Sequence, residues 1–75
     1  MKSIEDLIIF DQELKVGARL VGMFLEVMDD PQSTRQVAAD LGISESSALR
    51  YLKALEEKGR ARRVHPLWTS VEDPA

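Results

Sequence analysis

The cationic side chains of this 75-residue chain gather toward its carboxyl end. Residues 48–75 carry six lysines and arginines against four acids, a net charge of +2, whereas residues 1–47 carry four cations against nine acids, a net charge of −5. Clustered cations neutralise phosphates, and an arginine can also donate two hydrogen bonds to one guanine. The distribution therefore indicates a polyanion as the partner, although the whole chain has a net charge of −3.

The sequence offers no arrangement suited to catalysis or metal binding. It has no cysteine and one histidine, His65, so a thiolate site is excluded and a histidine site would lack further ligands. The acids Asp29-Asp30 and Glu56-Glu57 are neighbours in sequence, unlike the convergent carboxylates of an acid–base catalyst. We therefore expect no enzyme activity, no cofactor, no metal and no small-molecule ligand.

Capping signals predict the elements that position the cations. Ser33 begins the S-x-x-Q pattern of a capping box, and Gly42 suits the left-handed backbone that ends a helix. Ser44 can cap a second helix over residues 44–58. A short helix, a tight turn and a longer helix form a helix-turn-helix motif. The residues predicted to face the core are Val37, Ala38, Leu41, Ala48, Tyr51, Leu52 and Leu55.

A short hairpin is expected after the second helix. Residues 60–64 and 67–71 can both be extended, with His65-Pro66 at the turn between them. A single tryptophan in the last strand of a small domain usually fills the core, so we assign Trp68 to the core and leave His65 exposed to solvent. Residues 72–75 carry no structural signal.

Apolar residues dominate positions 4–28, which end at the helix-stopping run Asp29-Asp30-Pro31. One stripe at helical spacing is predicted to face the core: Leu20, Phe24, Val27 and Met28. A second apolar group is consecutive in sequence: Leu7, Ile8, Ile9 and Phe10. One small domain cannot cover this second group on all sides, so we expect it to contact another copy of the chain and form a homodimer. The alternative is that the segment folds back over the core.

The carboxyl-terminal half resembles the winged-helix DNA-binding domain of MarR-, ArsR- and IclR-type bacterial regulators and of the small FaeA- and PapI-type regulators. The residues that carry the resemblance are Val37-Ala38, Leu41-Gly42-Ile43-Ser44, Ala48, Leu52, Leu55, Glu56-Glu57-Lys58-Gly59 and Arg62-Arg63. The pattern is specific for the fold and weak for any one family.

This resemblance implies a mainly α protein with a small β-hairpin, a winged helix-turn-helix with a three-helix core and a short wing. Residues 1–75 would form one domain: an apolar extension over residues 1–16, the winged helix over residues 17–71 and a tail over residues 72–75. By position, the residues facing DNA would be Ser46, Ser47, Leu49, Arg50 and Lys53 on the second helix, with Arg60, Arg62 and Arg63 at the wing.

The function that follows is a sequence-specific regulator of transcription that binds double-stranded DNA, with residues 44–58 in the major groove and the wing on the backbone. Arg50 is the best candidate for reading a base, and its alternative role is a solvated charge paired with nearby glutamates. The apolar stretches are too short to span a bilayer, so we expect a cytoplasmic protein without membrane contact.

A different function would suit three features of the chain. The sequence is acidic overall, Leu49 stands where relatives usually carry a polar residue or arginine, and the wing lacks a long basic tip. These features favour a winged helix that contacts a protein, as a subunit or inhibitor of a transcription or mobile-element machine. An RNA-binding module lacks support, because no exposed aromatic platform is evident.

Overall fold

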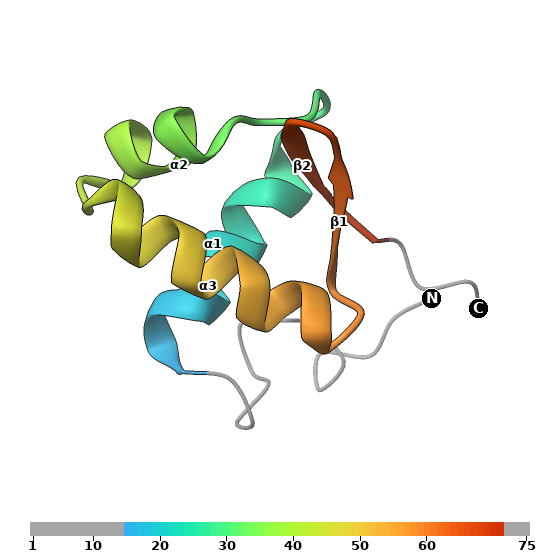
Figure 1. The fold of residues 1–75 in the computed structure, drawn as a ribbon, viewed down its shortest axis with the longest axis horizontal. Coiled ribbons are helices and arrows are strands. Elements are labelled where there is room, and N and C mark those ends of the chain that lie inside the picture. Colours follow the sequence, from blue (N-terminus) through green and yellow to red (C-terminus); the bar gives the residue numbers. More distant parts are fainter. Residues whose placement is uncertain (1–14, 72–75) are drawn as a thin grey trace.

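The computed structural model describes residues 15–71, which form three helices followed by a two-stranded hairpin (Figure 1). The elements are α1 (Val16–Val27), α2 (Thr34–Leu41), α3 (Glu45–Glu57), β1 (Ala61–Val64) and β2 (Leu67–Ser70). This architecture confirms the expected fold class. The predicted dimerisation residues Leu7, Ile8, Ile9 and Phe10 lie outside the described residues, as does the predicted tail.

The helix-turn-helix forms where the capping signals predict it. The Ser33 hydroxyl accepts a hydrogen bond from the Gln36 backbone N–H at 3.0 Å, and Gly42 ends α2 with a φ of 69°. The Ser44 hydroxyl accepts from the Ser47 N–H at 3.0 Å and begins α3. These bonds satisfy N–H groups that the first turn of a helix cannot pair internally. The start of each helix is therefore set by a residue that lies only three positions from its hydrogen-bond partner.

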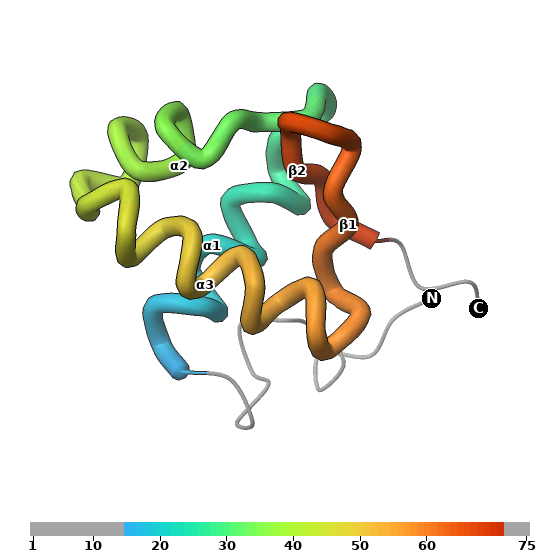
Figure 2. Tube along the Cα trace, in the orientation of Figure 1, coloured from blue at the N-terminus to red at the C-terminus, as the bar shows by residue number. Residues whose placement is uncertain are grey.

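One hydrophobic core joins the three helices and the hairpin, whose paths are clearest in the tube of Figure 2. Its buried members are Ala18, Val21, Leu25, Val37, Ala38, Ala48, Leu52, Leu55, Ala61 and Trp68. The predicted core faces of α2 and α3 are thus confirmed, with Leu41 and Tyr51 half-buried at the edge. Trp68 is only 2% exposed, which confirms its assignment to the core.

The face of α1 that enters the core differs from the predicted one. Leu20 and Val27 were expected inside, but they are 44% and 73% exposed, so the prediction is wrong for these two residues. Phe24 is half-buried and packs against the core, and Met28 is half-buried after the helix ends. The residues that α1 buries are Ala18, Val21, Gly22 and Leu25.

Close approach of α3 explains the choice of face. In Figure 1 α3 crosses in front of α1, and a side chain at Gly17 would collide with the ring and hydroxyl of Tyr51. Small residues along this side of α1 allow the two helices to pack closely, as ridges of one fit the grooves of the other. The bulkier Leu20 and Val27 side chains are left on the outside.

Besides its core contacts, the hairpin pairs through its backbone with the segment between α1 and α2. β1 and β2 are antiparallel, with Arg63 opposite Trp68. Gln32, between α1 and α2, then exchanges two backbone hydrogen bonds with Trp68, each 2.8 Å long. Trp68 therefore has a strand neighbour on both sides, although only β1 and β2 qualify as strands among residues 15–71.

The contact between Gly17 and Tyr51 can be tested by a double-mutant cycle. Alanine favours helix over glycine by up to about 1 kcal/mol, but here it must displace the tyrosine ring. We expect Gly17→Ala to stabilise the Tyr51→Ala protein by about 1 kcal/mol and to stabilise the wild type by clearly less. Urea denaturation measures both. Equal effects in the two backgrounds would show that the ring does not restrict position 17.

Candidate nucleic-acid interface

The outward side of α3 carries most of the side chains predicted to face DNA. Ala48, Leu52 and Leu55 are buried on one side of the helix. At 3.6 residues per turn, the opposite side carries Ser46, Arg50, Lys53 and Glu57, all of them exposed. The major groove of B-DNA is wide enough to admit an α-helix, so an exposed helix face of this kind can be presented to it. Glu57 brings an acid to the carboxyl-terminal end of this face, which the sequence reasoning did not include.

Two adjoining hollows mark this side of the domain. The first, about 250 Å³ in volume, lies between α3 and the hairpin and is lined by Thr34, Leu49, Lys53, Arg63, His65, Pro66 and Trp68. The second lies along α3 and is lined by Ser46, Leu49, Arg50, Lys53, Ala54 and Glu57. Leu49 and Lys53 belong to both, so the hollows form one continuous surface from the outer face of α3 to the hairpin.

Leu49 has a structural reason to be apolar. Its side chain is half-buried and packs against the hydrophobic core, while its remaining surface lines both hollows. A polar residue here would remove apolar contacts at the edge of the core. Leu49, which departs from the relatives' pattern, therefore contributes both to the edge of the core and to the outer surface.

Arg63 is held beside Lys53 by the tryptophan. Its guanidinium carbon lies 4.4 Å from the centroid of the Trp68 ring, within the range of a cation–π interaction. The Arg63 guanidinium thus stacks on the buried Trp68 ring and lines the same hollow as Lys53. Two of the predicted cations, one from the helix and one from the wing, are brought together in this way.

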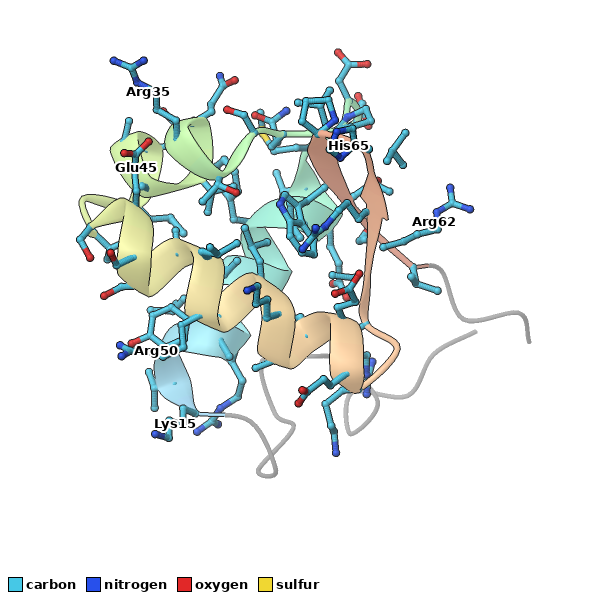
Figure 3. All side chains as sticks on the ribbon, in the orientation of Figure 1. Lys15, Arg35, Glu45, Arg50, Arg62 and His65 are labelled. Carbon is cyan, nitrogen blue, oxygen red and sulfur yellow. The ribbon has the colours of Figure 1, made fainter. Side chains whose placement is uncertain are left out.

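Arg62 points elsewhere. Successive side chains of a strand alternate between its two faces, so Arg62 and Arg63 cannot share a side. In Figure 3 the Arg62 side chain projects away from the domain, on the side opposite Arg50. Neither Arg62 nor the half-buried Arg60 lines the two hollows. Their predicted contacts with phosphate remain a prediction.

Arg50 is exposed and lies beside an aromatic ring. Its guanidinium carbon is 5.5 Å from the Tyr51 ring centroid, near the outer limit of a cation–π interaction. In water such a contact contributes roughly 0.5–1 kcal/mol, which a charge-assisted bidentate bond to a base can replace. The side chain is therefore positioned on the outer face of α3 without being locked there.

The two predicted serines differ in availability. Ser47 is half-buried, and its hydroxyl accepts a hydrogen bond of 3.0 Å from the Ser44 hydroxyl, while its N–H donates to the same oxygen. Ser46 is exposed and lines the hollow along α3. Ser46 is thus the serine that can reach a ligand, and Ser47 belongs to the cap of α3.

The hollow beside the hairpin also contains residues that sequence reasoning missed. Thr34 accepts a hydrogen bond from the Trp68 indole N–H at 3.1 Å, and His65 lies at the exposed turn of the hairpin (Figure 3). Both line the hollow with Lys53 and Arg63. Thr34 is brought there by its bond to Trp68, a contact between segments far apart in the sequence, and His65 by the turn that joins β1 to β2.

The residues that the structure describes offer neither a membrane span nor a metal site. Within residues 15–71, no helix is long and apolar enough to cross a bilayer. The same residues contain no group of three or more histidine, aspartate or glutamate side chains placed to hold a metal ion.

Comparison with known proteins gives one match. Residues 28–61 match a family model described as winged helix-turn-helix DNA-binding, a segment that begins after α1 and ends at the first residue of β1. The match supports double-stranded DNA as the partner and does not distinguish MarR-, ArsR- or IclR-type relatives. No curated protein and no solved structure matches the chain.

The bond between Trp68 and Thr34 should contribute measurably to stability. Thr34→Val removes the acceptor and leaves a buried indole N–H unpaired, so we expect the free energy of unfolding to fall by about 1–2 kcal/mol. Thr69→Val is the matched control on β2, with an expected change of about 0.5 kcal/mol or less. Urea denaturation followed by the fluorescence of the single tryptophan measures both. Equal losses would contradict a stabilising role for the Thr34 hydroxyl.

Proposed function

We propose that this winged helix-turn-helix protein regulates transcription by binding double-stranded DNA, with α3 in the major groove and the hairpin on the adjacent backbone. One observation carries the proposal: the outer face of α3 and Arg63 of β1 form a single exposed surface through the hollow that Lys53 lines. The family match supports DNA binding in general. The groove, the orientation and the sequence preference are our inference from the arrangement of side chains.

Arg50 is the residue we assign to base reading. Its guanidinium is exposed near the middle of the outer face, and this group pairs with O6 and N7 of guanine through two parallel hydrogen bonds. Ser46 lies one turn earlier on the same face. Because Glu57 would repel the backbone at the other end of the helix, the amino-terminal half of α3 is the part we place deepest in the groove.

Lys53 and Arg63 are the residues we assign to the phosphate backbone. They come from α3 and β1 and line one hollow, so a phosphate at this position would meet two cations from different elements. Such contacts supply affinity and fix the orientation of the protein without reading sequence. The short turn at His65 and Pro66 limits how far the wing extends, so we expect few contacts beyond this hollow.

Arg50→Ala should weaken binding to a preferred sequence more than binding to random DNA. Duplexes selected by the wild-type protein from a random library give the preferred site. On that site we expect Kd to rise about 5- to 150-fold, which corresponds to about 1–3 kcal/mol, with much less change on random duplex. Fluorescence anisotropy measures both. An equal loss on the two duplexes would contradict a base contact and assign Arg50 to the backbone.

The phosphate contacts can be tested through the dependence of Kd on salt. Arg63→Ala and Lys53→Ala should each weaken binding to all sequences alike and reduce the slope of log K against log salt by about 1. Arg62→Ala is the matched control, because it removes the same charge from the same strand on the face opposite Arg63. Wild-type protein that shows no salt-dependent binding at micromolar concentration would overturn the proposal in favour of a protein partner.

A further inference from the structure

α1 presents an apolar stripe on the side that faces away from the core. Its members Val16, Leu20, Met23 and Val27 are 62%, 44%, 41% and 73% exposed. They follow one another at intervals of four, three and four residues. At about 100° per residue, all four fall within a strip about 60° wide, about 180° from the buried residues of the helix.

This spacing is the pattern of a helix that pairs with another helix. Intervals of four and three residues place side chains alternately at the a and d positions of a heptad, where they interlock with those of a second helix. Single exposed apolar residues are common on protein surfaces and need no explanation. A continuous apolar stripe along the whole of a helix is different, because it exposes one contiguous apolar surface to water, and such surfaces mark interaction sites.

The charges of α1 are distributed in a way that favours an antiparallel partner. Lys15 and Arg19 lie at its amino-terminal end, whereas Glu26, Asp29 and Asp30 lie at or just beyond its carboxyl-terminal end. This order opposes the helix dipole, which favours acids at the amino end and bases at the carboxyl end. An antiparallel copy of the same helix would bring cations to the acidic end and acids to the cationic end, at both ends of the pair.

We propose that α1 pairs with α1 of a second copy of this chain, antiparallel and around a two-fold axis. Leu20 of each copy lies against Met23 of the other, and Val16 lies against Val27. The pairing does not rest on the proposed DNA binding. It also uses a surface different from the dimerisation segment predicted at residues 7–10.

The apolar stripe is separate from the candidate nucleic-acid interface. None of the four stripe residues lines either hollow beside α3. The contact is small, because a helix of 12 residues is only about 18 Å long. We therefore expect a weak dimer, with a dissociation constant in roughly the micromolar range.

Sedimentation of the full chain between roughly 1 and 200 µM tests the association, a range that brackets the expected dissociation constant. Leu20→Glu combined with Met23→Glu should raise the dissociation constant at least about tenfold, since each copy would bury acids in the apolar seam. Val64→Glu combined with Val71→Glu is the matched control: these residues are 42% and 38% exposed outside α1, so the same two changes there should leave the dimer intact. Circular dichroism verifies that each variant remains folded.

Introduced cysteines test the direction of the pair, since the chain has none of its own. In an antiparallel pair Val16 lies opposite Val27 of the other copy and about 16 Å from its own equivalent, beyond the ~7 Å between Cα atoms that a disulfide permits. Mixed Val16→Cys and Val27→Cys proteins should therefore cross-link to each other under mild oxidation. Each of these proteins alone should cross-link poorly.

Four outcomes decide the proposal. A dimer weakened by the double substitution, together with cross-links in the mixture alone, supports it. A full chain that stays monomeric at ~200 µM overturns it, because this concentration is far above the expected dissociation constant. The stripe would then be covered by another segment of the same chain or by a different protein. A dimer that the double substitution leaves unchanged also overturns it, and points to a different surface. Efficient cross-linking of Val16→Cys with itself would establish a parallel pair and overturn the antiparallel one.

Discussion

The environment of the Trp68 side chain is the constraint on which most of this small domain depends. Its ring is buried in the core, its indole N–H donates to Thr34 at the start of α2, and its backbone pairs with Gln32. The Arg63 guanidinium stacks on a face of the same ring. One side chain thus joins the hairpin to the helices and sets the position of a charge on the surface. A domain of this size buries only about 60% of its unfolded surface, so it has few other contacts that could do both.

The parts of the fold that the sequence predicted are those fixed by neighbouring residues. Ser33, Gly42 and Ser44 act through hydrogen bonds or backbone angles within four positions, so the bounds of α2 and α3 could be read directly. The face of α1 could not be read in this way. Both sides of that helix are apolar, and the choice between them depends on how closely Tyr51 of α3 approaches Gly17.

The candidate site was predictable in its residue types and less so in its grouping. Arg50 and Lys53 follow from helical spacing alone, since the buried residues of α3 define the opposite face. The strand period also separates Arg62 from Arg63, but it does not say which of them faces α3. That depends on the pairing of β2 with Gln32, which joins segments more than 30 residues apart. The inclusion of Thr34 likewise depends on a long-range contact, its bond to Trp68, whereas His65 is included through the hairpin turn.

Leu49 gives the proposed DNA-contacting face a chemical character that its charges alone would not provide. Part of its side chain lies in the core, and the rest lines the surface between Arg50 and Lys53. In the major groove the C5-methyl group of thymine is the one apolar feature that distinguishes a base pair, and aliphatic side chains contact it. An apolar residue at this position is therefore compatible with a target in which a thymine lies beside the base that Arg50 reads. In the proposed complex, the residue that most favoured a protein partner from the sequence would instead favour A·T pairs.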